Sequence, residues 1–385
     1  MIKLRWKDKW IDYISIEWSG TDNQCSRQIV FTIPSNPYDK GFEQLGIALG
    51  DLIYLYDDKT QLFLGTVTTR EKTAEIGQAT YTAMDFMHHL LRSNGTYKFT
   101  KTTAEKLTKK VCGDLDIGTT KLASTKINIP KLIFEDVPIY DMIVTAYRKA
   151  KASTGVNYMP KMVGNKISVI EKGQSSGVKL AQGITITGAN YKDSTDNMID
   201  MVKIFSDKGK KLGEVKEKKN ISSYGVYQKV YEKEEGIDAK KAAKAMMVGI
   251  TKEATVESLG DVKALAGYAI EIDDKATGLK GTFYISSDSH TFQDGTHMMS
   301  LELSWKNEME KGQEEEDSIK KDLTNGAKCW YIESGSVYHS STACPSCKGK
   351  KTKKSTVSKV KKIKITKGKN KGKRKYKPCS KCWNT

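Results

Sequence analysis

Two Cys-x-x-Cys pairs, Cys344 with Cys347 and Cys379 with Cys382, are separated by 31 residues near the C-terminal end of the chain. A two-residue gap lets two thiolates turn toward one metal ion, and two such pairs complete a tetrahedron. A redox-active pair is instead expected on a βαβ scaffold, and none is visible around these cysteines. Thiolate-rich tetrahedral sites suit zinc, so the spacing predicts a zinc site built from these four cysteines.

The segment that carries these cysteines, residues 326–385, also carries the net charge of the chain. It holds five of the seven cysteines and 18 of the 64 Lys and Arg residues, but one of the 46 acidic residues, which leaves 46 basic and 45 acidic residues elsewhere. A segment this polar cannot fold on hydrophobic burial, so we expect structural zinc to supply its folding free energy. Its lysines form either a solvated loop or a contact for a polyanion such as nucleic acid or a cell-wall polymer.

The rest of the chain has the composition of a folded, water-exposed protein, with a mean hydropathy of −0.53. Its 385 residues predict two or three domains, and the absence of an apolar run of eighteen residues excludes a membrane-spanning helix. The charged N-terminus lacks the apolar stretch of a signal peptide, so we expect synthesis in a reducing cytosol without disulfides. Cys25 and Cys112 are then expected to be buried as small hydrophobic residues.

Local patterns predict short strands over the first ninety residues and three helices further along. Residues 50–67 contain two β-rich runs around a polar turn at Asp57, Asp58 and Lys59. The predicted helices span 103–112, capped by a box of Thr102 and Glu105, then from Pro138 to before Gly155, and from Asp238 through Met246.

Two segments near the ends of the body of the chain, residues 1–305, share five residues, and we call this repeat the internal echo. At a constant offset of 216 residues, Asp57, Asp58, Lys59, Gly65 and Thr66 match Asp273, Asp274, Lys275, Gly281 and Thr282. Each copy reads as strand, acidic turn and strand, with the glycine inside the second strand, where bulges and close backbone approaches occur. The echo favours a duplicated barrel-like domain over two unrelated hairpins.

Enzyme signatures are absent from the sequence, which contains no GxSxG, HExxH, Walker or GxGxxG motif. His88 and His89 are interpreted as a helix flank, and His290 and His297 as the two sides of a hairpin turn at Asp294 and Gly295. The acidic cluster 314–317 lies in a charged stretch, 306–325, that reads as a solvated linker. The sequence therefore predicts a protein that is not an enzyme.

The order of several body segments resembles the XkdQ-type baseplate hub proteins of contractile phage tails and phage-tail-like bacteriocins. These segments are GDLIYLYDDKTQLFLGTV, ATYTAMDFMHHLL, TYKFTKTTAEKLTKKVC, NIPKLIFEDVPIYDMIVTAYRKAKASTGVNYMP and FYISSDSHTFQDGTHMMSLELSW. The resemblance spans roughly residues 1–305. It implies two tail-tube-like β-barrel domains with an α/β segment between them, and a homotrimer whose six similar units match a hexameric tube above and a three-fold spike below.

The C-terminal segment resembles the Ada-like metal-binding domain in Val-Tyr-His at 337–339, a following cysteine, and Tyr-Lys-Pro-Cys-Ser-Lys-Cys at 376–382. The spacing from His339 to Cys344 is one residue longer than in that family, and the following loop is long. The resemblance implies His339, Cys344, Cys379 and Cys382 as ligands, so His339 and Cys347 compete for one position. Cys329 is a sixth candidate.

The complete prediction is a mainly β protein with an α+β insertion. The expected parts are a first hub β-barrel (1–97), an α/β segment (98–180), a second hub β-barrel with an inserted helix (181–305), a charged linker (306–325) and a zinc-binding lysine-rich module (326–385). The resemblance implies a structural hub that joins the tail tube protein to the spike and to other baseplate proteins, in a phage or bacteriocin particle released on lysis. The alternatives are a nucleic-acid-binding zinc protein and a baseplate-associated cell-wall hydrolase.

Overall fold

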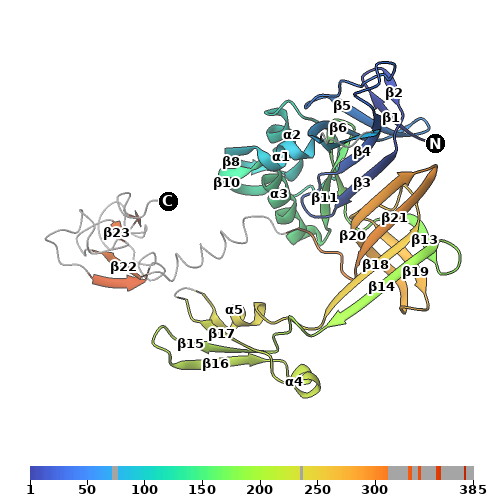
Figure 1. Ribbon diagram of the computed structural model, residues 1–385. Coiled ribbons are helices and arrows are strands. Elements are labelled where there is room, and N and C mark those ends of the chain that lie inside the picture. Colours follow the sequence, from blue (N-terminus) through green and yellow to red (C-terminus); the bar gives the residue numbers. More distant parts are fainter. Residues whose placement is uncertain are drawn as a thin grey trace. The chain divides into compact units, whose positions relative to one another are not determined.

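The computed structural model describes residues 1–71, 77–234 and 237–310, and the backbone of four short strands between residues 328 and 378. The described part is mainly β, as predicted. The chain divides into two compact units, Met1–Asp193 with Lys252–Gln313, and Ser194–Thr251 with Glu314–Thr385. Figure 1 shows the first unit as a long run of paired strands flanked by helices α1 to α3.

Thirteen strands of the first unit form one sheet, in the order β14-β18-β21-β20-β3-β4-β7-β6-β5-β1-β2, with β19 on β20 and β13 on β19. The first half of this sheet consists of β1 (Ile2–Trp6), β2 (Lys9–Ile11), β3 (Ser15–Thr21), β4 (Gln28–Ser35), β5 (Leu52–Asp57), β6 (Thr60–Glu71) and β7 (Gly77–Asp85). The second half consists of β13 (Ser175–Ala181), β14 (Ile186–Ser194), β18 (Thr251–Leu259), β19 (Ala269–Asp274), β20 (Leu279–Gln293) and β21 (Thr296–Ser304).

Each half of the sheet has its own hydrophobic core, because apolar and polar side chains alternate along its strands. Ile29, Phe31 and Ile33 of β4 are buried, and they join buried side chains from all seven strands of the first half. A second cluster, which includes Ile285 and Leu301, is contributed by the second half. Each half therefore packs around one buried face.

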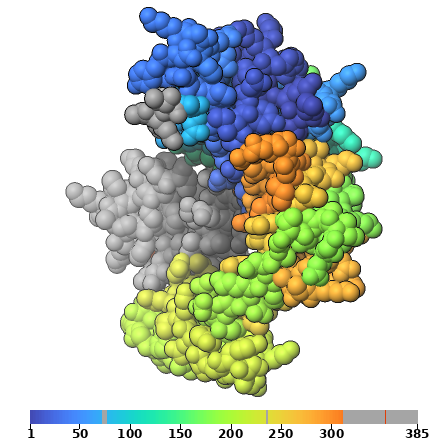
Figure 2. Space-filling view, turned by 45° about the vertical axis from the view of Figure 1, so that its right-hand side comes forward, coloured from blue at the N-terminus to red at the C-terminus, as the bar shows by residue number. Residues whose placement is uncertain are grey.

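The long strand β20 belongs to both halves. Its residues up to Tyr284 pair with β19, a register shift against β21 follows between Ile285 and Ser287, and residues from Ser287 onward pair with β3. Figure 2 shows the orange residues of the second half lying against the blue residues of the first. Because β20 continues into the first half, the pairing among the described strands follows an open path, in which no closed barrel is found, and the two tail-tube-like β-barrel domains stay a prediction.

Both copies of the internal echo are antiparallel hairpins with the glycine in the second strand, as predicted. The turn between β5 and β6 has two residues, whereas the turn between β19 and β20 has four. The two positions favour glycine for different reasons. A Cβ on Gly65 would lie 2.3 Å from the carbonyl oxygen of Met84, whereas Gly281 has a φ of +116°.

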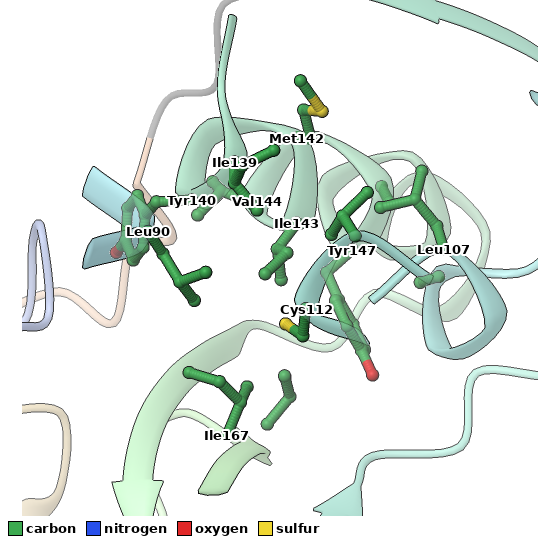
Figure 3. Close-up of a cluster of buried hydrophobic side chains, with 14 of the residues drawn as sticks. Leu90, Leu107, Cys112, Ile139, Tyr140, Met142, Ile143, Val144, Tyr147 and Ile167 are labelled. Atoms are coloured by element: carbon green, nitrogen blue, oxygen red, sulfur yellow. The ribbon is translucent and has the colours of Figure 1, made fainter. Parts of the chain in front are cut away.

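The helical part of the first unit has a separate core. It contains α1 (Met87–Arg92), β8 (Asn94–Thr102), α2 (Ala104–Gly113), β9 (Gly118–Leu122), β10 (Ile129–Pro138), α3 (Ile139–Thr154), β11 (Tyr158–Val163) and β12 (Lys166–Glu171). Strand β8 pairs with β10, and β12 lies between β11 and β9. Figure 3 shows Ile143 and Tyr147 of α3 beside Cys112 of α2, with Ile167 of β12 near them. Cys25 and Cys112 are buried free thiols, as predicted.

The predicted helices are present, but one cap differs. Helix α3 follows Pro138 and ends at Gly155, whose left-handed φ of 72° suits glycine. Helix α2 is capped by Thr103, which accepts from the backbone N–H of Lys106, and not by the predicted box. The carboxylate of Glu105 instead accepts a hydrogen bond from the backbone N–H of Thr125, so this side chain makes a contact distant in sequence in place of its part in the predicted box.

The second unit contains a small sheet, β16-β15-β17, from β15 (Met201–Phe205), β16 (Lys211–Lys216) and β17 (Gln228–Glu232). Helix α4 (Lys218–Tyr224) follows β16, and helix α5 (Ala239–Ala245) is the predicted inserted helix with Asp238 as its N-cap. The sheet itself was not predicted. Further along, β22 (Lys328–Tyr331), β23 (Val337–His339), β24 (Lys353–Thr356) and β25 (Lys377–Pro378) pair in the order β24-β22-β23-β25.

None of the helices in the described residues has both the length and the apolar character needed to cross a bilayer.

Candidate functional site

The predicted metal ligands lie largely outside the described residues. Cys344, Cys347, Cys379 and Cys382 fall outside them, and for His339 and Cys329 the structure gives the backbone alone. Within the part of the chain that the structure describes, no group of three or more His, Cys, Asp or Glu side chains is placed to hold a metal ion.

The backbone of the C-terminal strands bears on the choice of ligands. Strand β23, which ends at His339, runs parallel to β25, and Tyr338 pairs with Pro378. Pro378 is the residue before Cys379 in the sequence. The fold therefore brings the strand that ends in His339 beside the strand that leads into Cys379, which is compatible with both residues binding one ion.

A buried ion pair joins the two halves of the large sheet. The guanidinium of Arg27, the residue just before β4, donates from Nη1 to Asp288 Oδ1 of β20 at 2.9 Å and from Nη2 to Asp288 Oδ2. The side chain of Asp288 has no exposed area, and that of Arg27 has 19%. Asp288 also accepts from the backbone N–H of Ala266 at 2.6 Å. Burial raises the pKa of Asp288, but the charge and hydrogen bonds of Arg27, with His290, outweigh it and lower that pKa to about 2.

Two histidines extend this cluster along β20 and β21. His290 is fully buried, and its Nδ1 lies 3.0 Å from Nε2 of His297, while its Nε2 lies 3.2 Å from the carbonyl oxygen of Ala264. Burial, together with His290, lowers the pKa of His297 to about 4. Among the described residues no hydroxyl or thiol is hydrogen-bonded to either ring. The pair lies on either side of the hairpin turn, as predicted, and its contacts are those of a packed core.

His88 and His89 lie in α1, which agrees with their interpretation as part of a helix flank. Their rings are 5.9 Å apart, and each belongs to the six-residue helix that follows β7. Burial and the charge of Arg92 lower the pKa of His88.

A second polar cluster holds residues 306–310, the beginning of the predicted linker. Glu310 Oε2 accepts from the Tyr140 hydroxyl at 2.6 Å and from the backbone N–H of Gln24 at 3.1 Å. The Lys172 ammonium forms an ion pair with Asp22 at 2.7 Å and donates to the carbonyl oxygen of Glu308. Met309 is 5% exposed and packs in the core of α2 and α3. These residues are therefore part of the packed first unit.

Sequence reasoning missed both clusters. Arg27 and Asp288 are 261 residues apart, and Tyr140 and Glu310 are 170 residues apart. An isolated Arg, Asp or Glu in a polar sequence carries no local sign of such a partner.

The chain matches the model of the YqbQ-like family over residues 16–304. It is 28% identical over 317 residues to the uncharacterized protein YqbQ of Bacillus subtilis strain 168 and 25% identical to the phage-like element PBSX protein XkdQ of the same strain. Each match covers 79% of this chain and 96% of the relative.

Two solved structures share the fold. A 43 kDa tail protein of prophage MuSo2 from Shewanella oneidensis has a TM-score of 0.59 at 12% identity, over 79% of this chain and 98% of that one. A tail protein from Neisseria meningitidis MC58 has a TM-score of 0.55 at 13% identity, over 78% and 95%. The family match covers most of both halves of the sheet and the helical segment between them, so the chain belongs to the YqbQ-like family.

Proposed function

We propose that this chain is a structural hub of a phage-type tail baseplate, without enzymatic activity, that joins the tail tube to the central spike. The observation that carries the proposal is the pair of sheet halves, each with its own core, that share β20. This arrangement supplies two β units per chain in a fold shared with two tail proteins, one of them from a prophage, and XkdQ of a phage-like element is a relative.

A homotrimer of such chains presents six similar β units, which suits a junction between a six-fold tube and a three-fold spike. In this proposal each sheet half corresponds to one of the two tube-like domains implied by the resemblance. Strand β20 and the Arg27–Asp288 ion pair join the two halves to each other. The remaining surface is available to the tube, the spike and other baseplate proteins.

Electron microscopy of assembled particles tests this proposal. We expect density for three copies of the chain at the tube–spike junction, and we expect a deletion of its gene to yield tubes without spikes. Particles that are complete and carry spikes in the absence of this chain would refute the hub role.

The C-terminal segment is proposed to bind one structural zinc ion through four of the five residues His339, Cys344, Cys347, Cys379 and Cys382. Thiolate and imidazole donors suit zinc, which would stabilise the small four-stranded sheet. The parallel pairing of β23 with β25 favours His339 over Cys347 as the fourth ligand.

The measurement is the zinc content of the purified full-length protein and of two variants. We expect one zinc per chain, loss of zinc in His339→Ala and retention in Cys347→Ser. The reverse result would assign the site to the four cysteines, and a wild-type protein without zinc would end the proposal.

The 18 Lys and Arg residues of this segment support a further role in binding a polyanion such as nucleic acid or a cell-wall polymer. We expect the full-length protein to bind double-stranded DNA with an affinity that falls steeply as salt is raised, and a protein ending at residue 325 to lose this binding. Equal binding by both proteins would contradict the role.

A further inference from the structure

A cavity of about 90 Å³ lies where three parts of the first unit meet. Its polar walls come from β3 and the residues just before β4, from β11 of the helical part, and from residues 265–268, which lead into β19. The cavity has room for a few water molecules, each of which takes about 30 Å³, or for one small ion. A molecule bound there contacts all three parts at once.

Two buried N–H groups belong to side chains that line this cavity, and they have no hydrogen-bond partner within the described residues. They are Nε1 of Trp18 and Nε of Arg27. The Arg27 guanidinium lies 4.3 Å from the centroid of the Trp18 ring, so the two side chains are in contact. A buried donor without an acceptor destabilises the folded state. The two N–H groups therefore indicate that an acceptor belongs in the cavity.

Lys161 of β11 adds a cation to the lining. Its ammonium donates to the Tyr268 hydroxyl at 3.0 Å and lies 5.3 Å from the centroid of that ring. No acidic side chain pairs with this ammonium among the described residues. The charge of Arg27 is matched by that of Asp288, and no Asp or Glu lines the cavity. The lining therefore carries a positive charge that has no counter-charge.

Hydrogen-bond donors outnumber acceptors among the side chains of the lining. The only side-chain oxygens there are the hydroxyls of Thr21 and Tyr268, and Tyr268 already accepts from Lys161. A water molecule in the cavity would accept from the unpaired N–H groups, but it would need acceptors for its own two hydrogens, whereas an anion only accepts. The positive charge of the lining opposes the binding of a cation. The chemistry of the lining therefore favours an anion.

Apolar side chains complete the walls of the cavity and strengthen this preference. They are those of Leu62, Met159, Met162 and Leu265. Opposite charges attract each other more strongly in such a low-dielectric site than in water. The attraction to Lys161 and the hydrogen bonds from the two unpaired N–H groups offset the free energy needed to remove an anion from water.

We propose that this cavity binds one small monovalent anion, either chloride or a short carboxylate such as formate. Nε1 of Trp18, Nε of Arg27 and the ammonium of Lys161 donate to it. The bound anion connects the first sheet half, the helical part and the residues that lead into β19, beside the ion pair of Arg27 with Asp288. The volume of the cavity excludes nucleotides, so this site is separate from the proposed polyanion contact of the C-terminal segment, and it does not depend on the hub role.

The melting temperature of the full-length protein in different sodium salts tests the inference. Chloride and formate are each compared with gluconate, which is too large for a cavity of about 90 Å³, at equal ionic strength and pH 7. An anion that binds only the folded state raises the melting temperature. In wild type we expect saturating chloride or formate to raise it by about 3 °C or more relative to gluconate. The anion with the larger effect is the one that the site prefers.

A lysine substitution distinguishes binding in the cavity from general effects of the salts. Lys161→Met removes the ammonium but keeps a long unbranched side chain, and it should abolish the rise in melting temperature. The matched control is Lys131→Met, at an exposed lysine of β10 outside the cavity, and it should keep the rise of the wild type. Each rise is a difference within one variant, so a general loss of stability does not affect the comparison. The same rise in Lys161→Met as in wild type, or an equal loss in both variants, would overturn the proposal.

Crystals of the full-length protein locate the anion directly. We expect an anomalous peak in the cavity from crystals grown with bromide in place of chloride, or density for formate from crystals grown with formate. A cavity that holds only water in both crystals would refute the inference, even if the melting temperature depends on the salt.

Discussion

The ion pair between Arg27 and Asp288 makes a quantitative prediction about the joint between the two sheet halves. Asn in place of Asp288 leaves the Arg27 guanidinium, which is 19% exposed, without its counter-charge. Removing one partner of a buried ion pair costs about 3 to 5 kcal/mol. The lowering of the pKa of Asp288 from 3.8 to about 2 corresponds to roughly 2.5 kcal/mol, which is the same order. We therefore expect Asp288→Asn to lower the free energy of unfolding by about 3 kcal/mol or more at pH 7.

The pH dependence of the lost free energy of unfolding distinguishes the effect of the ion pair from an effect of changed packing. Because the pKa of Asp288 is lowered in the folded state, its contribution is fully present above the unfolded value of 3.8 and is lost as the pH falls toward 2. The difference between wild type and Asp288→Asn should therefore be constant from pH 7 to about pH 5 and shrink between about pH 4 and pH 2.

Urea unfolding followed by circular dichroism at pH 7, 5, 4 and 2.5 measures this difference. The control is Glu271→Gln, which removes an exposed ion pair with Lys179 and should cost less than about 1 kcal/mol. Two results would refute the reasoning. One is that, at pH 7, Asp288→Asn lowers the free energy of unfolding no more than the control does. The other is that the decrease for Asp288→Asn is the same at pH 2.5 as at pH 7.

Three further predictions concern packing and the segment 306–310. Gly65→Ala places a Cβ 2.3 Å from the Met84 carbonyl oxygen and should lower the free energy of unfolding in urea by more than about 2 kcal/mol. In the control Gly46→Ala the Cβ meets nothing within 4 Å, so the free energy of unfolding should hardly change. Ile143→Ala empties a fully buried position and should cost about 2 to 5 kcal/mol, whereas Ile133→Ala, at a site 44% exposed, should cost under 1 kcal/mol. Glu310→Ala removes the acceptor of Tyr140 and Gln24, so hydrogen exchange at the Gln24 amide should accelerate at least tenfold; an unchanged rate would show that Glu310 does not hold this segment.

Local signals in the sequence determined the elements that were predicted correctly. The start of α3 at Pro138, its end at Gly155 and the N-cap of α5 at Asp238 follow from backbone preferences of single residues and a 3.6-residue apolar period. The two echoed hairpins follow from strand alternation around polar turns. The zinc ligands were proposed from the spacing of the cysteines and from the resemblance to the Ada-like domain, and they stay a prediction because they lie outside the described side chains.

The tertiary structure alone decided how these elements combine. That β20 leaves β19 and continues along β3, that Arg27 lies against Asp288, and that Glu105 binds the Thr125 backbone instead of capping α2 are contacts between residues far apart in the chain. The alternation of side chains tells which face of a strand is buried, but not which strand lies beside it. Strand partners and buried ion pairs are selected by the free energy of the whole packed unit, and no window of the sequence contains that information.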